Sequence, residues 1–335
     1  MKRAIIEKIT PSLLGTNYIR RYLEESSKNS FRIIYYHFIS DKKEDYYFKN
    51  KGISVSEFTE QLDYFKKRFN IIKLSDAVEM QAEGVSLDGS LAITTDDGFS
   101  ENYHTIAPIL DEHNLSASIF IATDFIDNKD LMWRNKLVYL INRFPKEKIL
   151  KESALLSNSY FGKAIQINTI NDLMSWSLKE WGIEDKDILS KYLWDKFMPP
   201  VEEFLESKKP YLSTTQIKDL HSSGFDICSH SCSHPDLSKA SWDQYKDEVL
   251  NSILKLEQIT GDERFSFSYP FGKRASLEFE RRLTDDYENI SSMLGIINSN
   301  RNSKNPNSWE RDLQEDSKSM AQFRFLILPI VRKYF

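Results

Sequence analysis

Short apolar runs alternate along the chain with segments of helical periodicity. The run FRIIYYHFI at residues 31–39 predicts a buried strand that ends near His37. Two further runs, LAITT at 91–95 and SASIFIA at 116–122, predict strands of the same kind. Continuous apolarity is typical of parallel sheets, because both faces of such a sheet are covered.

Helical segments lie between the predicted strands. After Ser56, apolar side chains recur at helical spacing, namely Phe58, Leu62, Phe65 and Phe69. Further along, the sequence predicts a helix at about 213–223, a strand at 225–228, a helix at about 241–259 and, at 265–272, a strand followed by a turn. This repeated alternation predicts an α/β fold, either a parallel barrel or a doubly wound sheet.

Residues 127–209 break this alternation. They have helical periodicity and little strand character, and they carry the tryptophans Trp133, Trp176, Trp181 and Trp194 among charged residues. We therefore predict a helical insertion.

Charge and composition exclude several classes of protein. The chain of 335 residues has 45 basic and 50 acidic side chains, a formal charge of -5 and no long basic block, so nucleic acid is not expected as a partner. Two cysteines cannot form a disulfide framework. The first apolar stretch is broken by Glu7, Lys8 and Pro11, so it lacks a signal-peptide core, and no apolar run of about 18 residues occurs. We expect a cytoplasmic protein, with a membrane-peripheral one as the alternative.

Residues able to do chemistry follow several predicted strands. In parallel α/β folds the functional residues gather at the C-terminal ends of strands. Asp96 and Asp97 follow the strand at 91–95, His230 follows the strand at 225–228, and His37 lies at the end of the first strand. The two aspartates alone are also compatible with an ordinary turn.

The segment DICSHSCSHPDLS, residues 226–238, interleaves His230 and His234 with Cys228 and Cys232. In an extended chain these four would span roughly 20 Å, whereas zinc ligands lie about 2.0–2.3 Å from one ion. A compact centre made of all four is therefore not expected. If the chain turns, the two histidines can approach one ion, and a hydrolytic zinc site then needs a third protein ligand.

Three motifs together resemble those of the polysaccharide deacetylase family, carbohydrate esterase family 4, also called the chitooligosaccharide deacetylase homology domain. TTDDGFSENY is similar to its first motif, SHSCSHPDLS to its second and SYPFG to the core of its third. The resemblance implies a distorted (β/α) barrel formed by residues 31–126 and 210–315. A helical segment at 1–30, the insertion at 127–209 and an apolar segment at 316–335 would complete the chain.

The resemblance also implies a role for individual residues. Asp97, His230 and His234 would hold a divalent metal, with zinc expected first and nickel or cobalt also accepted by such ligands. Asp96 would be the general base. The backbone N–H of Phe271 would help to hold the oxyanion.

Two departures from the family pattern affect the acid and the base. The arginine that many members carry before the third motif is absent, so Arg311, in the WERDL stretch, becomes the candidate partner of Asp96, and Thr95 replaces an aromatic residue. No histidine follows His234. The branch that contains poly-N-acetylglucosamine deacetylases resembles this chain in its early Tyr-His, which makes His37 the candidate general acid; a core histidine is the alternative.

The expected activity is removal of N-acetyl groups from an amino sugar of a bacterial surface polysaccharide or its precursor. One alternative is hydrolysis of another C–N bond, such as that of a formyl group or a small amide. Another is an inactive carbohydrate-binding relic. The expected partner is an N-acetylated glycan. We expect the insertion to lie beside the barrel mouth and shape access, with a purely structural role as the alternative.

The C-terminal sequence QFRFLILPIVRKYF allows two interpretations. Its apolar residues, Phe323, Phe325, Leu326, Ile327, Leu328, Ile330 and Val331, either pack against the barrel or lie in a membrane interface with Arg332 and Lys333 near anionic headgroups. Burial of these side chains would remove the surface that membrane contact requires.

Overall fold

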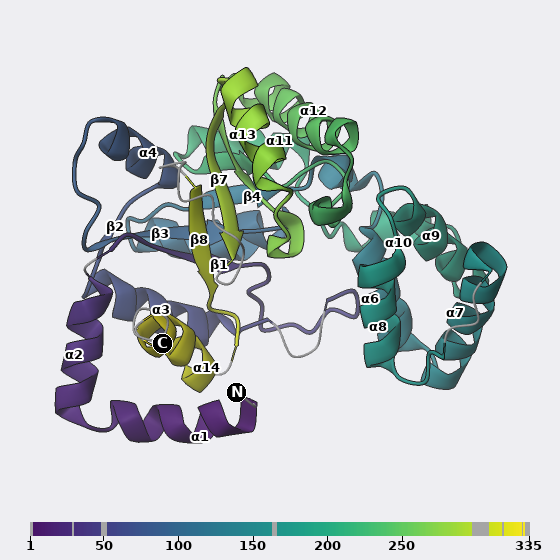
Figure 1. Ribbon diagram of the computed structural model, residues 1–335, viewed down its shortest axis with the longest axis horizontal. Coiled ribbons are helices and arrows are strands. Elements are labelled where there is room, and N and C mark those ends of the chain that lie inside the picture. The colour runs from purple at the N-terminus through teal and green to yellow at the C-terminus, as the bar shows by residue number, and fades with distance from the viewer. Residues whose placement is uncertain are drawn as a thin grey trace.

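In the computed structural model, helices surround one sheet of parallel strands (Figure 1). The structure describes residues 3–28, 30–47, 52–162, 166–296, 308–316, 318–329 and 331. The strands are β1 (Arg32–Tyr36), β2 (Asn70–Ile71), β3 (Ser90–Thr95), β4 (Ser118–Ile121), β5 (Asp226–Ser229), β6 (Phe265–Ser268), β7 (Ile290–Ile296) and β8 (Ser308–Leu313).

Seven of these strands close into a barrel. The order around the ring is β1, β3, β4, β5, β6, β7 and β8, which returns to β1, while β2 pairs with the start of β3. Between β1 and β3 the register runs from Arg32↔Leu91 to Tyr36↔Thr95, but β5 and β6 are joined only at Ser229↔Phe267. The predicted α/β class and distorted barrel are therefore confirmed.

The barrel helices place their apolar faces against the strands. Phe58, Leu62 and Phe65 of α3 are buried in the same cluster as Ile34 of β1 and Ile93 of β3. This burial explains why the sequence shows helical spacing between continuous apolar runs. These elements are α3 (Val55–Lys66), α4 (Leu74–Ala82), η1 (Asn102–Ile106), α5 (Ala107–Glu112), η2 (Thr123–Asn128), α11 (Thr214–Ser222), η3 (Leu237–Lys239), α12 (Trp242–Thr260), η4 (Pro270–Gly272) and α13 (Leu277–Asp286).

Five helices between β4 and β5 form a lobe on one side of the barrel (Figure 1). They have an apolar cluster largely of their own, in which Trp133, Trp176, Trp181 and Trp194 are all buried. The abundance of tryptophan in this part of the sequence is therefore explained by packing. The helices are α6 (Trp133–Arg143), α7 (Lys146–Phe161), α8 (Ile170–Glu180), α9 (Asp185–Phe197) and α10 (Val201–Lys208).

The two ends of the chain pack together. Helices α1 (Arg3–Leu14) and α2 (Asn17–Ser27) lie next to α14 (Lys318–Gln322) and η5 (Phe323–Ile327), as Figure 1 shows. Phe325, Leu326 and Ile327 are buried, and the Phe325 ring lies 5.1 Å from that of Phe65.

This burial bears on the two interpretations of the C-terminal segment. Because the described apolar core of the segment is covered by protein, membrane contact through Phe325, Leu326 and Ile327 is not supported. Ile330, Arg332 and Lys333 lie outside the described residues. Across the residues that the structure describes, no helix has the length and apolarity needed to cross a membrane.

Candidate metal centre and active site

The end of β3 delivers the two aspartates to the mouth of the barrel. The N–H of Asp96 donates to the carbonyl of Tyr36 at 2.9 Å, which extends the ladder between β1 and β3. Asp97 and Gly98 then both have a φ of 71°. A Cβ at Gly98 would lie 3.0 Å from Ile121, so both the backbone angle and the available space favour glycine. This turn fixes the direction of the Asp97 side chain.

The end of β5 delivers the two histidines. The N–H of His230 donates to the carbonyl of Ile121 at 2.9 Å. The chain then turns through positive φ at Ser231 and His234, and the N–H of His234 donates to the hydroxyl of Ser231 at 3.1 Å. The loop therefore brings the two imidazoles back toward each other, with ring centroids 4.9 Å apart.

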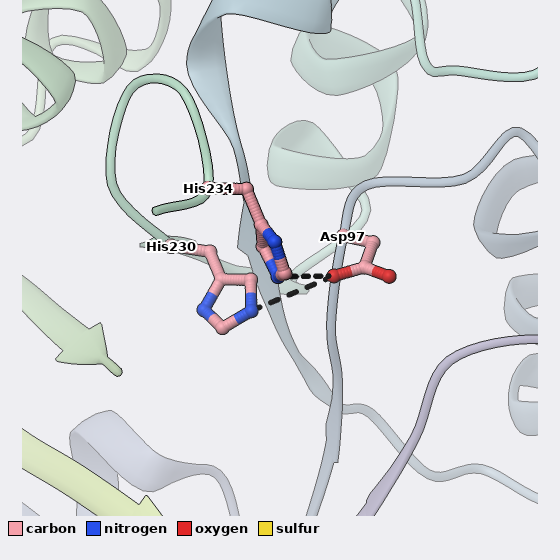
Figure 2. A group of neighbouring side chains, drawn as sticks. All are labelled: Asp97, His230 and His234. Carbon is pink, nitrogen blue, oxygen red and sulfur yellow. Dashed lines mark ion pairs between the residues drawn. The ribbon is translucent and has the colours of Figure 1, made fainter. Parts of the chain in front are cut away.

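Both imidazoles face the same carboxylate oxygen, as Figure 2 shows. Asp97 Oδ1 lies 3.5 Å from Nε2 of His230 and 3.2 Å from Nε2 of His234. Ligand atoms about 2.1 Å from one ion in a tetrahedral arrangement lie about 3.4 Å from each other. The spacing therefore fits three ligands of a single divalent metal ion.

Hydrogen bonding leaves these atoms available for a metal. His230 Nδ1 lies 2.9 Å from the carbonyl of Ser268 and 2.6 Å from its hydroxyl. Because a carbonyl can only accept, Nδ1 is assigned as the donor, and Nε2 keeps its lone pair. Asp97 Oδ1 is buried and accepts no hydrogen bond. In the described part of the chain, Asp97, His230 and His234 form the one cluster of potential ligands with this spacing.

The charges of the cluster also suit a metal. Burial alone would raise the pKa of Asp97, but the neighbouring His234 and His230 hold it well below its usual range. Burial lowers the pKa of His234. Metal ligands must be carboxylates and neutral imidazoles, and the shifts at Asp97 and His234 favour these forms.

Asp96 lies beside this cluster and is held by Arg311. Nη1 and Nη2 of Arg311 donate to Oδ1 and Oδ2 of Asp96 at 2.6 and 2.8 Å. Burial alone would raise the pKa of Asp96, but Arg311 and then His230 lower it below its usual value. Asp96 Oδ2 lies 4.0 Å from Nε2 of His230. The carboxylate is therefore ionised and oriented next to the three potential ligands.

The structure explains why Thr95 can replace the aromatic residue of the family pattern. Its side chain is buried, and its hydroxyl donates to Asn102 Oδ1 at 2.6 Å. A threonine therefore fills this position by joining β3 to η1.

His37 is bonded to a carboxylate that the sequence did not point to. Its Nδ1 lies 3.0 Å from Oε2 of Glu315, whose other oxygen accepts the backbone N–H groups of His37 and Phe38. Tyr47 also donates to Glu315, at 3.0 Å. Burial lowers the pKa of His37, but the Glu315 carboxylate outweighs burial and raises it to about 9. His37 is therefore half of an ion pair.

Phe271 lies in η4, the short turn that follows β6. Its φ is 57°, and its ring centroid lies 4.6 Å from that of His234. Gly272 follows with a φ of 64°, and a Cβ there would lie 2.1 Å from Ile296. The turn after Pro270 is thus tightly specified, and it places Phe271 beside a potential metal ligand.

One cavity of about 250 Å³ is lined by all six residues for which the sequence suggested a catalytic or metal-binding role, namely His37, Asp96, Asp97, His230, His234 and Phe271. They share its wall with Arg311, Glu315, several aromatic side chains and residues at the start of the lobe, Met132, Arg134 and Asn135. The lobe is also bonded to the histidine loop, because the indole of Trp133 donates to the carbonyl of His234 at 3.1 Å. Cys228 is buried in an apolar cluster, and neither it nor Cys232 belongs to the potential ligand group.

Comparison with family models identifies a segment of the chain. The model described as polysaccharide deacetylase matches residues 186–289. This segment contains His230, His234 and Phe271 but begins well after Asp96 and Asp97 in the sequence. No curated protein sequence shows a significant match.

Solved structures match most of the chain. A de-N-acetylase from Aggregatibacter actinomycetemcomitans aligns with a TM-score of 0.53 at 13% identity, covering 86% of this chain and 95% of that one. The deacetylase PplD of Streptococcus pyogenes, solved with acetate, aligns at 0.52 and 15% identity, covering 84% and 91%. A polysaccharide deacetylase from Bacillus cereus aligns at 0.52 and 16% identity, covering 88% and 67%. The chain therefore has the barrel fold of these deacetylases.

Proposed function

We propose that this protein is a metal-dependent member of the polysaccharide deacetylase family that removes N-acetyl groups from an amino sugar of a bacterial surface polysaccharide or its precursor. The observation that carries the proposal is the arrangement within one cavity of three potential metal ligands, an oriented carboxylate and an imidazole paired with a second carboxylate. The partial family match and the fold shared with known deacetylases support it.

Asp97, His230 and His234 would hold the metal, and their two nitrogens and one oxygen suit zinc first, with nickel or cobalt as other candidates. A divalent cation bound there would polarise the amide carbonyl and lower the pKa of a nearby water toward about 7. Three protein ligands are the usual number for a hydrolytic site.

Asp96 is the general base in this proposal. Arg311 holds both of its oxygens and keeps it ionised, so it can take a proton from the water that attacks the acetyl carbonyl. The backbone N–H of Phe271 would donate to the oxyanion that forms.

His37 is the general acid. Glu315 is bonded to Nδ1, so the other ring nitrogen, Nε2, is the one that can donate a proton. Its proton passes to the departing sugar nitrogen as the C–N bond breaks, which yields acetate and an amine. The proton taken by Asp96 and the one lost by His37 balance, and exchange with solvent restores both groups. The early position of this histidine supports a resemblance to the branch that contains poly-N-acetylglucosamine deacetylases.

The test measures metal content and acetate release from a panel of N-acetylated sugars and oligosaccharides. His234→Ala should lose both the metal and the activity, because two ligands seldom retain a catalytic ion. Asp96→Asn should keep the metal and lose activity, because Asp96 is the proposed general base and is not one of the proposed metal ligands. Formate as the released acid would indicate a deformylase, and the absence of any released acid with metal bound would reject the enzyme.

A further inference from the structure

Arg134 is the residue of the lobe that reaches the cavity with a charge. It lies in α6, and every residue of this helix from 133 to 140 is buried except Arg134, which is half-buried. It lines the same cavity as Asp97, His37 and Phe271. Part of its side chain therefore borders the space that a substrate would occupy.

The residues on both sides of Arg134 are fixed. Tyr211 accepts at its hydroxyl the backbone N–H of Met132 and the side-chain amide of Asn135, each at 3.1 Å. Trp133 donates to the carbonyl of His234. The helix start that presents Arg134 is thus bonded both to the barrel and to the histidine loop.

The guanidinium of Arg134 lies against aromatic rings. Its Cζ is 5.4 Å from the ring centroid of Phe271 and 5.8 Å from that of Trp133. Burial lowers the pKa of Arg134 to about 10, although nearby Asp97 opposes this shift, so the side chain is still charged at neutral pH. A cation with little water around it interacts strongly with an anion, because the local dielectric is low.

No step of the proposed reaction uses Arg134, whereas Arg311 positions the proposed base and Glu315 positions the proposed acid. Among the described residues that line the cavity, Arg134 and Arg311 are the two arginines, and lysine is not among them.

We propose that Arg134 determines specificity by binding an oxyanion, a carboxylate or a phosphate, on the sugar in the cavity or on the unit joined to it. The planar guanidinium fork matches both kinds of oxyanion. The inference rests on the proposed function for its N-acetylated glycan, and it narrows that substrate to an anionic one. A cavity of 250 Å³ is slightly below the usual range of about 300–1,000 Å³, so it suits one unit of a larger substrate.

The test compares three sugars that differ in charge. N-acetylglucosamine is neutral, N-acetylmuramic acid carries a carboxylate and N-acetylglucosamine 1-phosphate carries a phosphate. Saturation-transfer NMR on the metal-loaded protein gives the affinity for each sugar, and the acetate signal in the same spectra reports deacetylation. Absence of acetate would count against the proposed function, while the affinities still test Arg134.

We expect the wild-type protein to bind at least one of the anionic sugars about 10–100-fold more tightly than the neutral one, which is the range for a hydrogen bond to a charged group. The anionic sugar that binds more tightly shows whether Arg134 binds a carboxylate or a phosphate. Arg134→Met, which keeps a long apolar side chain against the rings, should abolish this preference. Arg134→Lys should keep part of it, because the charge remains.

Arg143→Met is the matched control, since it removes the same charge from the far end of α6, about 13 Å along the helix. The Arg143 side chain is 61% exposed, and its variant should keep the full preference. Equal affinity of the wild-type protein for all three sugars would overturn the proposal. A preference that persists in Arg134→Met would overturn it too, as would a uniform loss of affinity accompanied by a lower melting temperature.

Discussion

Arg311 and Asp96 form a bidentate ion pair inside the barrel, although 215 residues separate them. Arg311 belongs to β8 and Asp96 follows β3, and β1 lies between these two strands in the ring. The guanidinium of Arg311 lies over the Tyr35 ring, with Cζ 4.7 Å from the ring centroid. The pair is buried, so closure of the barrel by β8 is what orients the proposed base.

Arg311→Met should therefore damage both activity and stability. Removing one partner leaves a buried carboxylate without its counter-charge, which costs about 3–5 kcal/mol of unfolding free energy. Acetate release should fall, while bound metal, measured by mass spectrometry, should be retained because Asp97 and both histidines are unchanged.

The double variant Asp96→Asn/Arg311→Met is the control for that prediction. It removes both charges, so it should recover part of the lost stability in urea unfolding without recovering activity. Full activity in Arg311→Met would show that Asp96 needs no orienting partner.

Glu315→Gln should change the pH dependence of the reaction. Burial of His37 lowers its pKa, but Glu315 raises it to about 9, and the proposed acid works only when protonated. Without the Glu315 charge, His37 loses its proton at lower pH, so the alkaline limb of the kcat profile should move to lower pH. Tyr47→Phe, which removes one hydrogen bond from Glu315 but no charge, should shift this limb less.

The pair of His37 and Glu315 should also stabilise the fold in a way that depends on pH. A raised pKa in the folded state means that the contribution is complete below the ordinary histidine value of about 6.5 and is lost as pH rises through about 9. Urea unfolding of wild type and Glu315→Gln across this pH range measures it. An equal pH dependence in both proteins would contradict the pairing.

The sequence predicted those parts of the fold that follow from local apolar patterns. Strand β1 and helix α3 appear as a continuous apolar run and a helical spacing, and both are found. Strand β8 reads SWERDL and has no such pattern, because Arg311 and Asp312 are buried through ion pairs with Asp96 and Arg32. Partners that lie far away in sequence decide whether such charges are inside or outside.

The candidate site shows the same division. Asp97, His230 and His234 follow strands and lie in recognisable motifs, so their proximity in space could be predicted from the sequence. Glu315 lies in no motif, and its role depends on the register of β8 against β1, where Ile34 faces Asp312 and Tyr35 faces Leu313. The one signal for it in the sequence is its place shortly after the strand that carries Arg311.

Gly272→Ala should disrupt the turn that carries Phe271. The new Cβ would lie 2.1 Å from Ile296 at a φ of 64°. Gly261→Ala is the matched control, because Gly261 has a φ of 81° but no atom within 4 Å of the place that a Cβ would take. Both should lose about 1–2 kcal/mol from backbone strain, and Gly272→Ala should lose more because of the overlap. Equal unfolding free energies and equal activity for the two variants would show that Ile296 does not constrain the turn.

Trp133→Phe should loosen the histidine loop, because the indole N–H of Trp133 donates to the carbonyl of His234. Trp194→Phe is its control: this buried indole donates to the carbonyl of Pro199 at 2.9 Å, within the lobe. Each variant loses one hydrogen bond and about 1 kcal/mol of unfolding free energy.

The two variants should differ in metal affinity, measured by competition with a chelator. Trp133→Phe frees the backbone that positions His234, and loss of such outer support commonly weakens metal binding by about tenfold or more. Trp194→Phe has no contact with the ligand loop and should bind metal as the wild type does. If both variants retain wild-type metal affinity, the lobe does not support the metal centre, and the bond between Trp133 and His234 contributes to folding alone.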